Sequence, residues 1–117
     1  MERGSEQLQL QQQGLFELFR LQLKKDFEGA GLDAGFCEHI PQEWSILKNV
    51  LQEQLTRAGK MGGRELENLL YRIDVSEEQI KRYSKLNPSI SFLELVSELV
   101  IKRVLQKVVI RKNFPQK

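Results

Sequence analysis

Cys37 and His39 are the residues whose chemistry could support catalysis, because a thiol beside an imidazole can form a nucleophile and base pair. Their spacing of two positions places both side chains on one face of an extended segment, but no third group is available to orient them. His39 is the only histidine, which excludes histidine-based metal sites within one chain. The single cysteine cannot form an internal disulfide. We therefore expect no enzymatic activity, catalytic residue, metal or cofactor.

The segment 57–64 mixes glycine with basic residues, as phosphate-binding loops do. It lacks the GxxxxGK[ST] spacing that a phosphate loop requires, and no strand pattern precedes it. The glycines are instead typical of a flexible joint between two helices. We expect no nucleotide site here.

The C-terminal region is basic, since no acidic residue follows Glu98. Such a segment could contact an anionic partner. Cations at this position are also favoured by the dipole of a helix near its C-terminus, so the charge has a purely structural explanation as well. The basic residues are Lys102, Arg103, Lys107, Arg111, Lys112 and Lys117.

Length and composition indicate one globular domain. The chain has 117 residues, of which 40% are hydrophobic and 29% are charged, and both fractions are near globular averages. Residues 1–13 are polar and rich in glutamine, which predicts a tail or a weak extension of the first helix, and residues 14–117 are expected to form the helical domain. The sequence shows neither a signal peptide nor an apolar run long enough to cross a membrane, so a cytoplasmic location is expected.

Apolar residues recur at three- and four-residue steps along most of the chain, which predicts an all-α compact bundle of four to five helices. Pro41 suits the first turn of the second helix, which should stop before Gly59. Trp44, near the start of that helix, is either a core anchor or an exposed contact residue. The expected helices cover residues 15–28, 41–58, 66–73, 77–86 and 92–112.

Two serines have the spacing of capping boxes. Ser76 precedes Gln79 by three positions and Ser91 precedes Glu94 by three, so a helix should begin after each serine. The first of these helices should end at Asn87, because the residue before a proline is disfavoured in helical conformation. This helix is expected to turn its apolar residues inward, namely Ile80, Tyr83 and Leu86.

The C-terminal helix is expected to be long and apolar, and its apolar face changes side partway along. Plotted at 100° per residue, Glu94 and Glu98 lie opposite the early apolar residues, but the later aliphatic residues lie on the same side as these glutamates. Three explanations are open. The helix is central and packs on different neighbours at its two ends, its second half docks on another protein or copy, or it breaks or becomes a strand near Ile101.

The second explanation predicts a function. An exposed aliphatic stripe would form an interaction surface, so we expect a non-catalytic protein-interaction or adaptor module that binds a protein partner or a second copy of itself. The alternative is a small nucleic-acid-binding protein that uses the basic C-terminal helix. The predicted contact residues are the aliphatic Ile101, Val104, Leu105 and Val108, flanked by the basic Lys102, Arg103, Lys107 and Arg111.

Overall fold

The computed structural model describes residues 3–113, and within that range the chain forms α-helices and one short 3₁₀ helix, without a β-strand. This confirms the all-α bundle predicted from the sequence. The helices in chain order are α1 (Arg3–Gln11), α2 (Gln13–Gly29), the 3₁₀ helix (Gly35–His39), α3 (Trp44–Lys60), α4 (Glu65–Ile73), α5 (Glu77–Leu86) and α6 (Phe92–Asn113).

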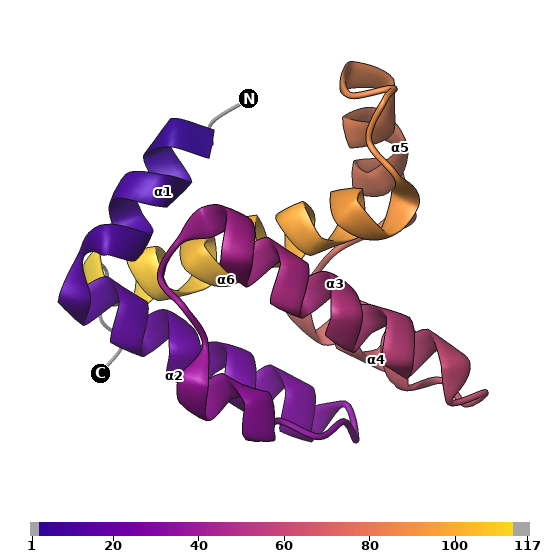
Figure 1. Ribbon diagram of the computed structural model, residues 1–117, viewed down its shortest axis with the longest axis horizontal. Helices are drawn as coiled ribbons and strands as arrows, with labels where there is room; N and C mark the ends of the chain where they lie inside the picture. Colours follow the sequence, from indigo (N-terminus) through magenta and orange to yellow (C-terminus); the bar gives the residue numbers. More distant parts are fainter. Residues whose placement is uncertain (1–2, 114–117) are drawn as a thin grey trace.

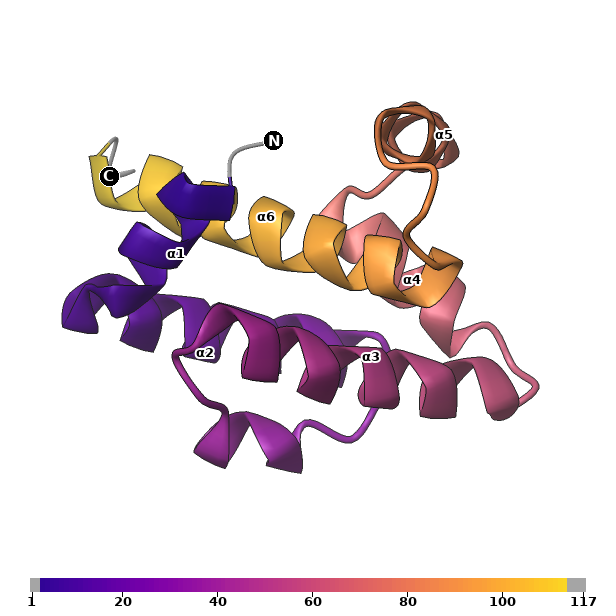
Figure 2. The same ribbon diagram turned by 45° about the horizontal axis from the view of Figure 1, so that its top comes forward.

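Helix α6 passes behind α3 in Figure 1, and Figure 2 shows α6 in one layer with α2 and α3 together in a second layer on one side of it. The most extensive contacts of α6 are with α3 and α2, and it also touches α1, α4 and α5. At one end of the molecule α5 stands away from both layers and packs on α6 (Figure 2). The central position of α6 determines which of its residues can reach a partner.

The change of apolar side in α6 arises because this helix is enclosed on several sides. Four of its later aliphatic residues are at most 2% exposed in their own chain. Of the three explanations, the structure matches the central helix that packs on different neighbours at its two ends. The segment 101–112 is helical throughout, so the strand alternative is wrong. The buried aliphatic residues are Ile101, Val104, Leu105 and Val108.

A lysine of α3 neutralises the two glutamates in the first half of α6, of which Glu98 is buried and Glu94 is partly exposed. Lys48 donates to Glu94 at 2.6 Å and to Glu98 at 3.1 Å. The side chain of Glu98 is completely buried, and the hydroxyl of Tyr83 on α5 donates to its other oxygen at 3.1 Å. A buried carboxylate is tolerated only when it is paired and hydrogen-bonded in this way. This ion pair therefore ties α3, α5 and α6 together.

A second buried carboxylate, Asp26 of α2, binds a lysine in the C-terminal half of α6. Lys107 donates to Asp26 at 3.1 Å and to the backbone carbonyl of Arg72 at 3.3 Å. Gln22 donates to the same carboxylate at 3.1 Å, and the guanidinium of Arg72 lies 3.7 Å from it. The polar residues of α6 are therefore placed by specific partners on α2, α3, α4 and α5.

Several element boundaries differ from the sequence-based expectation. Residues 1–13 include α1, whose Leu10 is fully buried in the common core. Pro41 precedes the first turn of α3, which begins at Trp44 and continues through Gly59. The expected loop 29–40 contains the 3₁₀ helix. Trp44 is buried, which matches the core-anchor alternative.

Candidate functional site

The predicted aliphatic contact stripe lies in the core, which corrects the exposure that the sequence suggested. Ile101 and Val104 are fully buried, and Leu105 and Val108 are almost so. The alternation of glutamates and aliphatic residues looked like two surfaces because the sequence does not reveal that Lys48 sits opposite the glutamates. Since these side chains are covered by their own chain, they are not accessible to a partner.

The four predicted basic residues are separated by the fold. Lys107 pairs with buried Asp26 of α2, whereas Arg103 reaches Asp74, the C-cap residue of α4, at 2.7 Å. Lys102 and Arg103 line a groove between α5 and α6. Arg111 lines a different groove, between α2 and α6. They therefore do not form one continuous basic stripe along α6.

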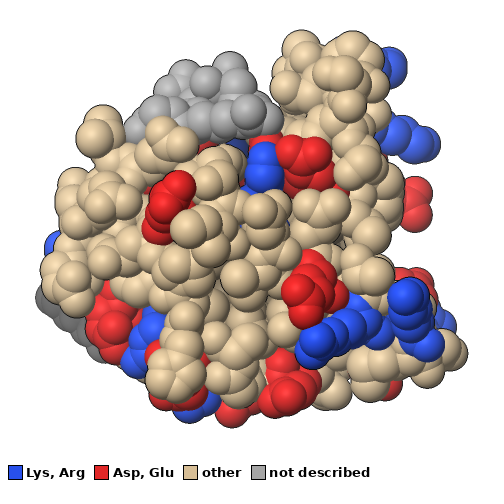
Figure 3. All heavy atoms as spheres, in the orientation of Figure 1, with Lys and Arg blue, Asp and Glu red and all other residues tan. Residues whose placement is uncertain are grey.

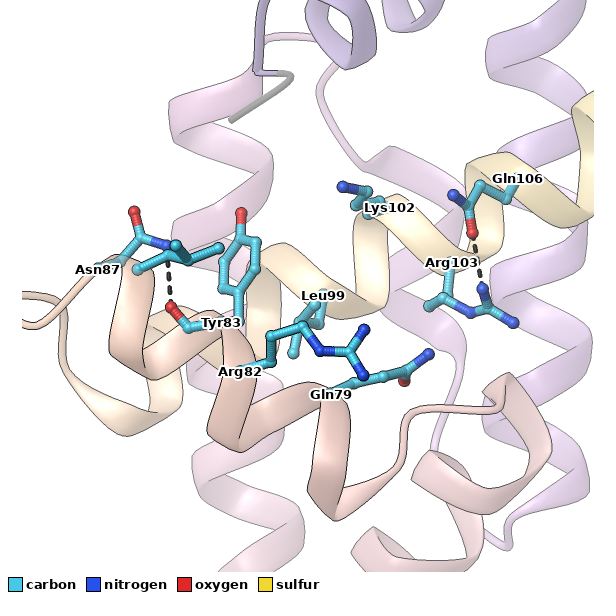
Figure 4. Close-up of a pocket in the computed structure, with 9 residues that line it drawn as sticks. Gln79, Arg82, Tyr83, Asn87, Leu99, Lys102, Arg103 and Gln106 are labelled. Carbon is cyan, nitrogen blue, oxygen red and sulfur yellow. Dashed lines mark hydrogen bonds between the residues drawn. The ribbon is translucent and has the colours of Figure 1, made fainter.

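One candidate site on α6 is the groove that α5 forms with it. This α5–α6 groove has a volume of about 540 Å³. Figure 4 shows Arg82 extending from α5 toward α6, with Leu99 between the two helices and Lys102 and Arg103 pointing in different directions. The lining residues are Gln79, Arg82, Tyr83, Leu86, Asn87, Leu99, Lys102, Arg103 and Gln106.

The position of α5 follows from its sequence and explains why the groove is open. The Ser76 hydroxyl accepts from the backbone N–H of Gln79 at 3.2 Å, and the Gln79 side chain accepts from the backbone N–H of Ser76 at 2.9 Å, so the predicted capping box is confirmed. No residue of α5 is fully buried. The expectation that Leu86 turns inward is wrong, since 74% of its surface is exposed. The apolar side of α5 is thus only half covered, by α6.

The charge of the α5–α6 groove is positive. No aspartate or glutamate is among the residues that line it. The two terminal nitrogens of Arg103 donate to Gln106 at 2.8 Å and to Asp74 at 2.7 Å, so its charge is already paired with a carboxylate. Neither Arg82 nor Lys102 forms an ion pair with any other residue in the 3–113 range. Two uncompensated cations therefore flank an apolar floor made by Leu86 and Leu99.

Sequence reasoning found Lys102 and Arg103 but missed the α5 wall of the groove. Gln79, Arg82, Tyr83 and Leu86 follow the i, i+3, i+4, i+7 pattern of one helix face. Because Leu86 has the spacing of a core residue, the sequence alone predicts that this face is covered. The signal was present in the spacing, although only the fold shows that this face meets α6.

Cys37 does not have the properties of a nucleophile. It is fully buried beneath α2, and burial raises the pKa of its thiol to about 12. At neutral pH it therefore carries almost no thiolate, which is the reactive form. His39 follows in the same 3₁₀ helix and is exposed.

We expect the Cys37 thiol of the folded protein to react with the thiol reagent DTNB at least about 100-fold more slowly than the unfolded chain, because both access and ionisation are reduced. The measurement is the labelling rate at pH 8 with and without guanidinium chloride. Equal rates in the two conditions would show that Cys37 is accessible and ionised in the native state.

Other kinds of site find little support in the described structure. Residues 3–113 contain no group of three or more His, Cys, Asp or Glu side chains placed to hold a metal ion. Over the same range, none of the helices combines the length and apolarity needed to cross a bilayer. Acidic and basic side chains are scattered over the face seen in Figure 3, without a continuous basic surface.

Comparisons with family models, with curated protein sequences and with solved structures found no match for this chain. A function must therefore be inferred from the geometry and charge of the grooves.

Proposed function

We propose that this chain is a non-catalytic protein-interaction module that holds an acidic, amphipathic helix of a partner protein in the α5–α6 groove. The observation that carries the proposal is the pairing of an apolar floor, Leu86 and Leu99, with the uncompensated cations Arg82 and Lys102. The reason for expecting an interaction is therefore this groove, not the buried aliphatic stripe of α6.

The shape of the groove favours a helical occupant. Its wall on α5 extends from Gln79 to Asn87, which is about 12 Å at the rise of an α-helix. A helix buries its apolar stripe against a neighbouring element, and the main neighbour of α5 is α6. A third helix laid beside α5 and α6 would complete this layer. Peptide helices commonly dock in such grooves through residues spaced i, i+3, i+4 and i+7.

The charge of the groove selects the sign of the partner. Acidic side chains at the edges of the incoming helix would meet Arg82 and Lys102, whereas basic ones would be repelled. Glutamine and asparagine side chains at the rim can donate hydrogen bonds to the same carboxylates. Nucleic acid is a weaker candidate, because the cations of α6 face different directions and Lys107 is already paired with Asp26.

The test uses two designed peptides of 14 residues that carry leucines at i, i+3, i+4 and i+7, one with flanking glutamates and one with flanking lysines. We expect the acidic peptide to bind and the basic peptide to bind at least about 100-fold more weakly, since like charges in contact cost several kcal/mol. Fluorescence anisotropy of the labelled peptides measures both affinities. Equal binding of the two peptides would contradict the proposal.

Reversing the charge of the groove should remove most of this affinity. We expect Arg82→Glu/Lys102→Glu to weaken acidic-peptide binding about 100-fold, because attraction becomes repulsion at both positions. Lys81→Glu/Lys85→Glu is the matched control, since it makes the same change of charge on exposed residues of α5 that do not line the groove. An equal loss in the control would show that net charge, not the groove, governs binding.

Two further measurements separate the proposal from its alternatives. Labelled single-stranded RNA that binds as tightly as the acidic peptide, with a steep loss of affinity on adding salt, would favour the nucleic-acid function. Light scattering that shows a dimer of the native chain, disrupted by Arg82→Glu/Lys102→Glu, would make a second copy the occupant of the groove.

A further inference from the structure

A second groove lies between α2 and α6, at the opposite end of α6 from α5 (Figure 2). It has a volume of about 420 Å³, within the range of about 300–1,000 Å³ that is usual for small-molecule sites. Leu18 and Leu21 form its wall on α2 and remain 41% and 48% exposed. Buried Val108 contributes the floor on α6.

Cations stand at both ends of this α2–α6 groove. The amino group of Lys112 lies 3.9 Å from the point that a Cβ atom would occupy if one were added to Gly14, near the start of α2. Lys107, in contrast, contacts Asp26 near the end of α2. The two helices are therefore antiparallel. Arg111 and Lys112 consequently mark the end of the groove near the start of α2, and Lys25 marks the other end.

The charge of the α2–α6 groove is also uncompensated. Lys25, Arg111 and Lys112 form no ion pair with another residue between positions 3 and 113. No acidic residue lines the groove. Their aliphatic stems add to the apolar walls while the charged ends remain in water, as long basic side chains commonly do. A ligand that fits needs an apolar body and an anionic end.

We infer that the α2–α6 groove binds the acyl chain of a free fatty acid, with its carboxylate held by Arg111 and Lys112. The alkyl chain would lie along Leu18 and Leu21 and displace water from their exposed surfaces. The wall on α6 is only about one helical turn long, from Val108 to Lys112. This wall is too short to give a partner helix an extensive contact. A single alkyl chain is narrower and can pack along the α2 wall alone.

The test titrates the full chain with laurate below its micellar concentration and follows binding by isothermal titration calorimetry. We expect saturable binding of one laurate, and no saturable binding of dodecyltrimethylammonium, which has the same alkyl length and the opposite charge. Binding of both amphiphiles alike would overturn the inference, because it would mean that the carboxylate is not recognised.

Variants assign the site. We expect Arg111→Glu/Lys112→Glu to weaken laurate binding by at least about tenfold, the effect of losing a charge-assisted hydrogen bond. Leu21→Asn should weaken it as well, and both variants keep the fold because the altered side chains are exposed. Lys81→Glu/Lys85→Glu, which changes the net charge equally on α5, should bind as the native chain does. Unchanged affinity in the first two variants would overturn the assignment.

Vesicles provide the competing source of an acyl chain. Sedimentation of the protein with vesicles of phosphatidylserine and phosphatidylcholine, without binding of free laurate, would overturn the inference in favour of a bilayer surface. Free laurate binding without sedimentation supports it. Both results are independent of the α5–α6 groove, so they remain informative if the acidic-peptide proposal fails.

Discussion

Replacing both Val104 and Val108 by glutamate is expected to abolish the cooperative unfolding transition of this chain. Both side chains are almost completely buried in the central helix α6. Two carboxylates placed there without partners would each cost several kcal/mol. A domain of this size is stabilised by only about 5–15 kcal/mol in total. Thermal melting followed by circular dichroism should therefore show a broad, non-cooperative loss of helix.

A matched pair of substitutions on the same helix separates burial from charge. Gln106→Glu/Ile110→Glu adds the same two negative charges at exposed positions, where Ile110 keeps 59% of its surface in solvent. We expect this control to melt cooperatively within a few degrees of the native chain, since exposed substitutions usually change stability by no more than about 0.5 kcal/mol. If the Val104→Glu/Val108→Glu variant melts like the control, these two residues are exposed and available to a partner, contrary to their burial in α6.

The sequence was sufficient to predict the helical class and the location of most helices. Heptad-like spacing and the capping residue Ser76 act within a few residues, so they can be recognised without knowledge of the fold. The orientation of α6 could not be obtained in the same way. Glu94 and Glu98 indicate a solvent-facing side when considered alone. Glu98 is nevertheless an interior residue, because Lys48, 50 positions earlier, supplies the compensating charge.

The candidate sites depend on the same kind of long-range information. Lys102 and Arg103 were selected from the sequence as part of one basic flank, yet each has a different environment in the fold. The α5 wall of the groove was missed because Leu86 has a spacing typical of a core residue. It remains exposed since no other helix covers that side of α5. Periodicity identifies the face of a helix, but the arrangement of helices decides whether that face is covered.

Removing the ammonium group of Lys48, which neutralises Glu94 and Glu98, is the second change with a large expected effect. Lys48→Met preserves the bulk of the side chain but leaves Glu98, whose side chain is fully buried, without its cation. Breaking a buried ion pair in this way typically costs about 3–5 kcal/mol. We expect a loss of that size in the free energy of unfolding, measured with urea. The hydroxyl of Tyr83 still donates to Glu98, which favours the lower end of the range.

The double variant Lys48→Met/Glu98→Leu tests whether the loss comes from the unpaired carboxylate. Replacing both members of a buried pair by apolar residues is often neutral, so the double variant should regain most of the stability that Lys48→Met loses. If the double variant is as unstable as the single one, an unpaired carboxylate at Glu98 is not the cause of the loss. Glu43→Gln, on the exposed N-cap residue of α3, is the control and should cost no more than about 1 kcal/mol, the usual size of a charge effect at a helix N-terminus.

The stabilisation by Lys48 should also depend on pH in a defined direction. Burial disfavours the charged form of Lys48, but its hydrogen bonds with Glu94 and Glu98 outweigh this effect and raise its pKa above 10.5. A raised pKa means that the folded state binds the proton more tightly than the unfolded chain does. The stabilisation is then complete below about pH 10.5 and is lost as the pH rises through the folded-state pKa.

The difference in unfolding free energy between the native chain and Lys48→Met should therefore be constant from pH 7 to about 10 and shrink above it. A difference that stays constant up to pH 12 would mean that the charge of Lys48 does not stabilise the fold.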